Sequence, residues 1–211
     1  MFDSSLRRVL NTPLHAIAVA VDRPGITPNR LTTAGLVLGL GSAAAAAAQL
    51  WWWSLALWLA SRVFDGLDGS LARLRRQTAA NSEAGHSEAG GFFDIVADFT
   101  VYGFTVFGVG IGVTAGFDAP WWPFVLVLIA YYLNGGAFLA FSSIAERTNR
   151  QIDDGRSLSF LGRFAEGTET IVVHSLWLIF PFVAWQIALV WAVFVGVSAV
   201  QRMIAGYRAL R

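Results

Sequence analysis

Four aspartates, Asp65, Asp68, Asp94 and Asp98, interrupt stretches of sequence that are otherwise apolar. At about 100° per residue, the members of the two pairs lie about 60° and about 40° apart on a helix, so each pair shares one face. Within membrane helices, four charges at roughly 2.5–3.5 kcal/mol each cost on the order of 10–14 kcal/mol, so something must compensate them. Crowded carboxylates share protons or bind cations, and Arg62 could neutralise only one of the four. An all-oxygen set without His or Cys favours Mg²⁺ or Mn²⁺.

Small residues accompany these acids. Gly66, Gly69 and Ala72 remove bulk from the carboxylate face, which lets a ligand approach the helix backbone. Arg73 follows Asp68 by about one turn, where its guanidinium could bind a phosphate oxygen with two hydrogen bonds. Metal-binding acids, an arginine and a face without bulk together predict a pocket for a diphosphate.

The composition indicates that the helices carrying these residues lie in a membrane. Of the 211 residues, 55% are hydrophobic and 14% are charged, which leaves too few polar side chains to cover a soluble globule. We therefore do not expect a water-soluble enzyme, a disordered chain or a nucleic-acid-binding module, and we expect no nucleic-acid partner. Cysteine is absent, which excludes disulfides, thiolate metal sites and cysteine nucleophiles.

Apolar runs of about twenty residues, the length that crosses a bilayer core, predict an all-α protein with six membrane spans. The approximate spans are 31–50, 52–72, 91–113, 121–143, 170–182 and 186–205. Arginines outside the spans lie near both termini, between the second and third spans, and between the fourth and fifth. The opposite turns carry none, and these are 51–53, 114–120 and 181–185. The positive-inside rule therefore places both termini and the four acids at the cytoplasmic face.

Residues 1–25 differ in kind from the spans. Apolar residues recur there at helical spacing from Leu6 to Val21, with polar and basic residues opposite, which predicts an amphipathic helix lying in the cytoplasmic interface. A cleaved signal peptide is the alternative, but the apolar stretch 16–21 is short and charged residues follow it directly. We expect this helix to precede a six-helix membrane domain over 26–211. The composition, rich in Arg, Ala and Gly, is typical of a G+C-rich bacterial genome, so we expect the bacterial inner membrane.

Other small residues predict where helices pack closely. They are Gly35, Gly39, Gly108, Gly112 and the alanine run 43–48. Smooth faces of this kind allow membrane helices to approach each other. We interpret them as structural, and they also permit self-association.

The acid pattern resembles the signature of the CDP-alcohol phosphotransferases, integral membrane enzymes that make phospholipids. That signature is Asp-x2-Asp-Gly-x2-Ala-Arg followed by Gly-x3-Asp-x3-Asp, and residues 26–32 are similar to the start of the family's first helix. All fixed positions are met, by Asp65, Asp68, Gly69, Ala72, Arg73, Gly90, Asp94 and Asp98. Sixteen residues separate Arg73 from Gly90, more than is usual in the family. The excess holds a near-tandem repeat over 82–91, typical of an expanded polar loop.

The resemblance implies metal-dependent transfer from a CDP-linked lipid, CDP-diacylglycerol above all, to a small alcohol, with release of CMP. Asp65, Asp68 and Asp94 would hold two Mg²⁺ or Mn²⁺ ions against the donor diphosphate, and Asp98 would be a further ligand and the general base. The donor contacts implied are Gly69, Ala72, Arg73, Gly90, Asn29 and Thr32. The family resemblance also implies a homodimer.

The sequence leaves the acceptor open. Arg163, with Arg147 or Arg150, would suit a phosphorylated acceptor such as glycerol phosphate or inositol phosphate. Glu166 and Glu169 would suit an amino alcohol instead. A purely structural interpretation, in which these are interfacial charges and a helix start, stands beside both.

Intramembrane carboxylates also mark ion pathways, so a transporter or proton relay is the alternative function. The acids crowd on two consecutive helices near one face, and inverted repeats are not evident, which favours the enzyme. A membrane scaffold that has kept the motif without activity is a further alternative.

Overall fold

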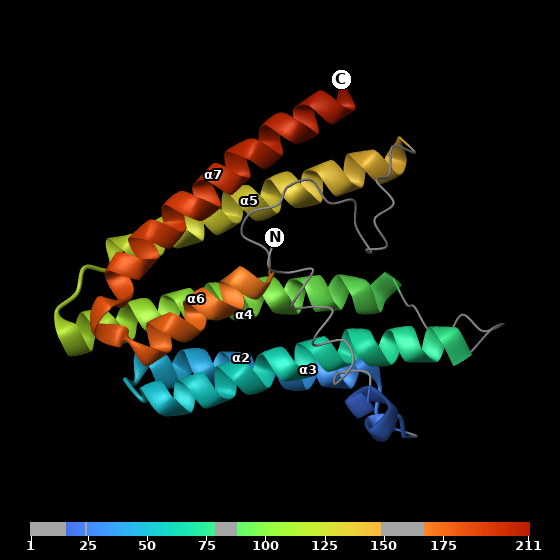
Figure 1. The fold of residues 1–211 in the computed structure, drawn as a ribbon, viewed down its shortest axis with the longest axis horizontal. Helices are drawn as coiled ribbons and strands as arrows, with labels where there is room; N and C mark the ends of the chain where they lie inside the picture. The colour runs from blue at the N-terminus through green and yellow to red at the C-terminus, as the bar shows by residue number, and fades with distance from the viewer. Residues whose placement is uncertain (1–15, 24, 79–87, 149–166) are drawn as a thin grey trace.

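A computed structural model describes residues 16–23, 25–78, 88–148 and 167–211, and within them the chain forms helices and no β-strand. Figure 1 shows the helices running roughly alongside one another as a bundle. In chain order they are α2 (Pro28–Ala47), α3 (Trp51–Thr78), α4 (Glu88–Phe117), α5 (Trp122–Arg147), α6 (Gly167–Ile179), the 3-10 helix η2 (Pro181–Val183) and α7 (Ala184–Leu210).

Local sequence sets the ends of α2 and its pairing with α3. Thr27 caps the N-terminus by accepting a backbone hydrogen bond at 3.3 Å, and Pro28 occupies the first turn. Beyond the helix, Gln49 adopts a left-handed conformation with φ of 62°, and the chain reverses into α3. Ser42 and Ser54 each donate a hydrogen bond to the other's carbonyl, at 2.8 and 2.9 Å, which holds the two helices closely together.

Glycines bring α4 against α2. A Cβ on Gly108 would overlap the backbone of Ala43, and a Cβ on Gly112 would overlap that of Ala46. A Cβ on Gly39 would meet the side chain of Val101 at 2.6 Å. The prediction that small residues allow close helix packing is confirmed at these positions.

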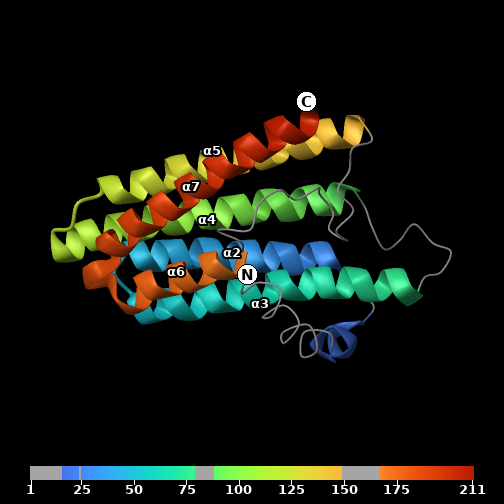
Figure 2. The ribbon, with the colours of Figure 1, turned by 45° about the horizontal axis from the view of Figure 1, so that its top comes forward.

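The remaining helices complete the bundle on two sides of α4 (Figure 2). α5 packs along α7, and α6 lies against α3. Figure 2 shows α4 between the α5–α7 pair and the α2–α3 pair. Large buried side chains, among them Trp58 of α3 and Trp177 of α6, fill the centre of the bundle.

Four segments among the described residues are long and apolar enough to cross a membrane: α2, α4, α5 and the run from η2 through α7. An all-α membrane protein is therefore confirmed. α3 has 28 residues, about 42 Å of helix, but carries the charges of the acid motif. α6 has 13 residues, about 20 Å. Membrane crossings by these two helices remain predictions.

The turns differ from those predicted. Residues 51–53, expected to be a turn, are the first residues of α3, because the left-handed Gln49 lets residues 48–50 reverse the chain. α4 continues to Phe117, and the turn that follows uses Asp118 with φ of 51°. Residues 181–183 are a 3-10 turn, and α7 begins at Ala184.

Of the predicted N-terminal interfacial helix, residues 1–15 lie outside the described part of the chain, while residues 16–21 are helical. Ala18 is buried. Asp22 forms an ion pair with Arg75 of α3 at 2.7 Å, and Arg75 also donates to the carbonyl of Ile26 at 2.7 Å. These contacts tie the segment before α2 to the C-terminal half of α3.

Candidate active site

Three carboxylates from two helices meet near one end of the bundle. Asp65 and Asp68 lie on α3 and Asp94 lies on α4, and one oxygen of each lies within 4.8 Å of the others. The spacing of three residues places the first two on one face of α3, as predicted. The structure thus brings together three of the four acids of the motif.

The geometry of this set fits a hard divalent cation. Oxygens bound to one Mg²⁺ at roughly 2.0–2.1 Å lie up to about 4.2 Å apart, and oxygens around a larger ion at roughly 2.3–2.6 Å lie up to about 5 Å apart. The separation of the three oxygens is close to these values. Because the donors are all carboxylates, they suit Mg²⁺ or Mn²⁺ better than zinc. Like charges this close also favour a cation between them.

Thr32 of α2 supports this set from a third helix. Its hydroxyl donates to Oδ2 of Asp68 at 2.6 Å, and Asp68 is only 4% exposed. The same hydroxyl lies 3.1 Å from the carbonyl of Pro28, but its single proton favours the shorter, charge-assisted bond. The structure shows that Thr32 orients a carboxylate, and its predicted contact with the nucleotide stays a prediction.

Asp98 lies one turn beyond Asp94 on α4 and is paired differently. Its Oδ1 accepts a hydrogen bond from Nη1 of Arg62 at 2.7 Å. The same nitrogen lies 3.7 Å from Asp65. The same arginine nitrogen therefore lies close to both Asp98 and Asp65.

Arg62 is itself enclosed. Its side chain is 6% exposed, and its guanidinium carbon lies 5.1 Å from the ring centre of Trp58 and 5.0 Å from that of Tyr102. It donates to the Tyr102 hydroxyl at 3.2 Å and to Oγ of Ser61 at 3.0 Å. Sequence reasoning treated this arginine only as a partial neutraliser, although its position three residues before Asp65 already placed the two on one helical face.

The other residues predicted to contact the donor lie on α2, α3 and α4. Nη1 of Arg73 lies 3.3 Å from where a Cβ on Gly69 would stand, so the guanidinium lies over that glycine. Nη2 of Arg73 donates to Oγ of Ser70 at 3.1 Å. Ala72 is half-buried on α3, and Gly90 lies in the first turn of α4. Asn29 is exposed in the first turn of α2.

The predicted acceptor residues are described only in part. Arg147 ends α5 and is exposed. Arg150, Arg163 and Glu166 lie outside the described residues. Of the four predicted acceptor residues, the structure therefore describes the position of Arg147 alone.

A buried polar network that the sequence did not reveal joins three helices. The Tyr131 hydroxyl of α5 lies 2.9 Å from Nε2 of His174 on α6, and Nε1 of Trp191 on α7 donates to it at 2.7 Å. The His174 ring stacks on Trp177 at 4.6 Å and lies 4.9 Å from Trp58. A histidine and a tyrosine inside apolar spans were the only signals of this network in the sequence.

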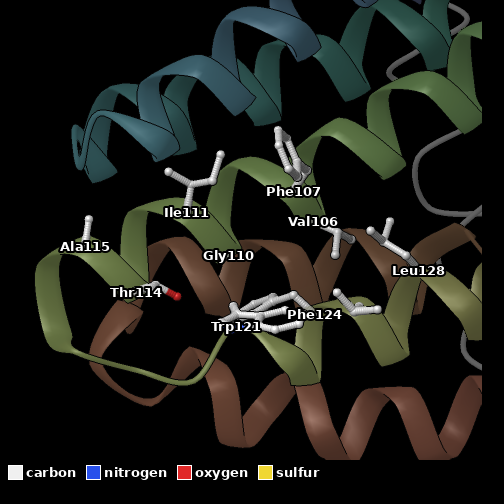
Figure 3. Close-up of a pocket in the computed structure, with 10 residues that line it drawn as sticks. Val106, Phe107, Gly110, Ile111, Thr114, Ala115, Trp121, Phe124 and Leu128 are labelled. Atoms are coloured by element: carbon white, nitrogen blue, oxygen red, sulfur yellow. The ribbon is translucent and has the colours of Figure 1, made fainter.

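An apolar groove of about 420 Å³ lies between α4 and α5, lined by residues that include Val106, Gly110, Trp121 and Phe124. Figure 3 shows these residues on the last turns of α4, on the turn that follows and on α5. Asp94 lies near the opposite end of α4. The groove is therefore separate from the carboxylate site.

Comparisons with known proteins agree with the site. The family model for CDP-alcohol phosphatidyltransferase matches residues 25–198. Inner membrane protein YnjF of Escherichia coli (strain K12) is 34% identical over 191 residues, which are 88% of this chain and 84% of YnjF. Archaetidylinositol phosphate synthase of Pyrococcus horikoshii is 28% identical over 154 residues, which are 71% of this chain and 78% of that protein.

A solved structure has the same fold. The crystal structure of Mycobacterium tuberculosis phosphatidylinositol phosphate synthase (PgsA1) with CDP-DAG bound gives a TM-score of 0.61 at 22% identity. The match covers 93% of this chain and 91% of that one.

Fold, acid motif and family match together define a membrane-embedded transferase of phospholipid biosynthesis. The chain belongs to the CDP-alcohol phosphatidyltransferase family, which confirms the resemblance seen in the sequence. Enzymes of this family transfer a substituted phosphate group from a CDP-alcohol to a second alcohol and generally depend on divalent metal ions, for which the described residues supply a carboxylate cluster. The alternative of a transporter or proton relay is not favoured.

Proposed function

We propose that this protein transfers a phosphatidyl group from CDP-diacylglycerol to a small alcohol, with release of CMP and with Mg²⁺ or Mn²⁺ held by Asp65, Asp68 and Asp94. The observation that carries the proposal is the approach of three carboxylate oxygens, from α3 and α4, to within 4.8 Å of one another. The structural neighbour has CDP-DAG bound, which supports the choice of donor.

The four acids divide two tasks in the reaction, metal binding and proton transfer. When bound, one or two divalent ions neutralise the donor diphosphate and stabilise the charge that develops on the leaving oxygen. Asp98 is the general base, since Arg62 occupies its Oδ1 and its second oxygen is left to accept a proton. The acceptor oxygen bonds to the phosphorus next to the lipid as its proton passes to Asp98. The bond from that phosphorus to the oxygen of CMP breaks, and CMP leaves with the electron pair.

The donor lies along the acid face of α3. Gly69 and Ala72 leave room for the nucleotide, and Arg73 binds a diphosphate oxygen from its place above Gly69. Gly90 and Asn29, in the first turns of α4 and α2, complete this set of contacts.

A phosphorylated acceptor is the substrate class that we propose. Arg147, Arg150 and Arg163 supply positive charge in and near the segment between α5 and α6. Two proteins similar to this chain have names that end in inositol phosphate synthase, which makes inositol phosphate the first acceptor to test and glycerol phosphate the second. Glu166, in the same segment, would contact the acceptor if that acceptor were instead an amino alcohol.

We also propose six membrane crossings, with α3 and α6 as the two added spans and residues 1–25 as an interfacial helix. The arginine distribution supports a cytoplasmic location for both termini and for the carboxylates. The name of the Escherichia coli relative supports the inner membrane. A homodimer is proposed from the family resemblance alone.

The test is CMP release by the purified full chain in lipid nanodiscs with CDP-diacylglycerol, Mg²⁺ or Mn²⁺, and one acceptor at a time. The acceptors are inositol phosphate, glycerol 3-phosphate, serine and choline. We expect release with one acceptor and its loss in chelator. Asp94→Asn should lower the rate by at least about 100-fold, as loss of a metal ligand does.

Asp118→Asn is the matched control, because Asp118 lies in the turn at the far end of α4 and asparagine tolerates its left-handed conformation. Its rate should stay within about twofold of the unaltered protein, since surface substitutions have small effects. Absence of metal-dependent CMP release with every acceptor would contradict the proposed function.

A further inference from the structure

We propose that Arg62 is a positioning residue for the transfer. It fixes the Asp98 carboxylate in place as the base and keeps that carboxylate out of the metal-binding set. This inference rests on the proposed function, in which Asp98 accepts the proton of the acceptor.

The guanidinium group reaches several partners at once. Nη1 donates to Oδ1 of Asp98 at 2.7 Å and to the Tyr102 hydroxyl at 3.2 Å, and Nη2 donates to Oγ of Ser61 at 3.0 Å. A planar guanidinium held at both terminal nitrogens has a fixed direction. The Asp98 oxygen that it binds therefore has a fixed direction too.

Aromatic rings prevent the guanidinium from moving away. Trp58 and Tyr102 lie on it at 5.1 and 5.0 Å. Trp58 is fully buried, its Nε1 donates to Oγ of Ser175 at 3.2 Å, and its ring packs on His174. The guanidinium end of the ion pair with Asp98 is therefore buried, and a charged hydrogen bond from a buried group is stronger than one in water.

The position of Arg62 divides the four acids into two groups. It lies 2.7 Å from Asp98 and 3.7 Å from Asp65. Asp65 also belongs to the three carboxylates that converge, with Asp68 and Asp94. Nη1 of Arg62 thus contacts Asp98 and lies near Asp65 of this set, and the ion pair occupies Oδ1 of Asp98.

Removal of Arg62 should therefore damage turnover more than donor binding. In Arg62→Gln the Asp98 carboxylate is free to turn toward the other three, and loss of alignment of this kind costs about 100-fold in rate. We expect kcat to fall by about 10–100-fold, while KM for CDP-diacylglycerol changes by less than about threefold. Arg62→Lys keeps the charge but lacks the planar group, and should recover at most about a tenth of the rate.

The experiment is a double-mutant cycle on the full chain in nanodiscs, with Arg62→Gln, Asp98→Asn and the double variant. Arg75→Gln is the matched control, because Arg75 lies on the same helix and also pairs with an aspartate, Asp22. The first readout is CMP release with the acceptor that gives the highest rate. If Arg62 acts through Asp98, the double variant should release CMP at the same rate as Asp98→Asn alone.

The second readout is Mn²⁺ binding, followed by electron paramagnetic resonance of the free ion, which requires no turnover. Asp98→Asn should weaken Mn²⁺ binding by at most about threefold in the unaltered chain, because Asp98 is not a ligand there. In the Arg62→Gln background, where Asp98 has joined the metal set, the same change should weaken binding by about tenfold or more. Arg75→Gln should leave both CMP release and Mn²⁺ binding within about twofold of the unaltered protein.

The outcomes separate the two proposals. The positioning role would be overturned if Asp98→Asn weakened Mn²⁺ binding equally with Arg62 present and with Arg62→Gln. It would also be overturned if Arg62→Gln reduced CMP release equally with Asp98 present and with Asp98→Asn. Coupled Mn²⁺ binding without CMP release from any acceptor would instead overturn the proposed function and leave the positioning role intact. Should Arg62→Gln fail to fold, Arg62→Lys, which keeps the buried charge, replaces it in the same cycle.

Discussion

The hydroxyl of Thr32 on α2 lies 2.6 Å from Oδ2 of Asp68 on α3, and it donates to the most buried acid of the site. α2 carries none of the acids, yet this bond makes it part of the carboxylate set. The position of α2 is fixed in turn by its glycine contacts with α4. The geometry of the site therefore depends on three helices, two of which supply the acids.

Thr32→Val should weaken Mn²⁺ binding and CMP release by about tenfold or more, because a hydrogen bond to a charged group contributes roughly 1.5–3 kcal/mol. Thr32→Ser, which keeps the hydroxyl, should stay close to the unaltered protein. Thr33→Val is the matched control, since its exposed hydroxyl donates only to the carbonyl of Asn29. Equal values for Thr32→Val and Thr33→Val in a Mn²⁺ titration would show that the bond to Asp68 has no effect on the metal site.

Gly108→Ala should destabilise the protein, because its Cβ would overlap the backbone of Ala43 and force α2 and α4 apart. Overpacking of this kind costs about 1–3 kcal/mol. Thermal unfolding in detergent, followed by tryptophan fluorescence, should show a lower Tm. Gly103→Ala on the same helix is the control, since no atom lies within 4 Å of its added Cβ. A Tm that is the same for both variants would contradict the packing role of Gly108.

Helical periodicity could predict much of this site because it is a local property. Asp65 and Asp68 share a face of α3 whatever surrounds that helix, and the small residues at 69 and 72 follow the same rule. The convergence of Asp94, and not Asp98, with that pair depends on how α4 is rotated against α3. Glycines such as Gly108 pack α4 against α2, and α2 in turn packs on α3. The sequence predicts close contacts at these glycines but not which helix each one contacts.

Contacts between distant residues are the part that sequence reasoning misses. Thr32 and Asp68 are 36 residues apart, as are Arg62 and Asp98. No local pattern pairs them, so the sequence alone assigns Thr32 to the nucleotide and Arg62 to general neutralisation. The turns differ from their predicted places for a related reason, since a left-handed residue such as Gln49 shortens a turn in a way that hydropathy does not reveal.

Tyr131→Phe should lower stability, because the Tyr131 hydroxyl is shared by His174 and Trp191 and so connects α5, α6 and α7. Its removal leaves two buried polar atoms without this partner, at a cost of about 1–3 kcal/mol each. The neighbouring Tyr132 is 79% exposed, so Tyr132→Phe is a control that differs by one position. A thermal unfolding curve of Tyr131→Phe that overlays that of Tyr132→Phe would contradict a stabilising role for the network.

The proposed topology can be tested with single cysteines, because the chain contains none of its own. Ala48→Cys and Asp118→Cys lie at exposed positions in two of the three turns proposed to face away from the cytoplasm. Glu88→Cys and Arg208→Cys lie at exposed positions near the opposite ends of α4 and α7. In intact bacterial spheroplasts, a maleimide that cannot cross membranes should label the first two, and should label the others only after permeabilisation. Opposite labelling of Ala48→Cys and Glu88→Cys would establish that α3 crosses the membrane despite its charges. Labelling of both from the same side would contradict the six-span topology and, with it, the cytoplasmic location of the carboxylates.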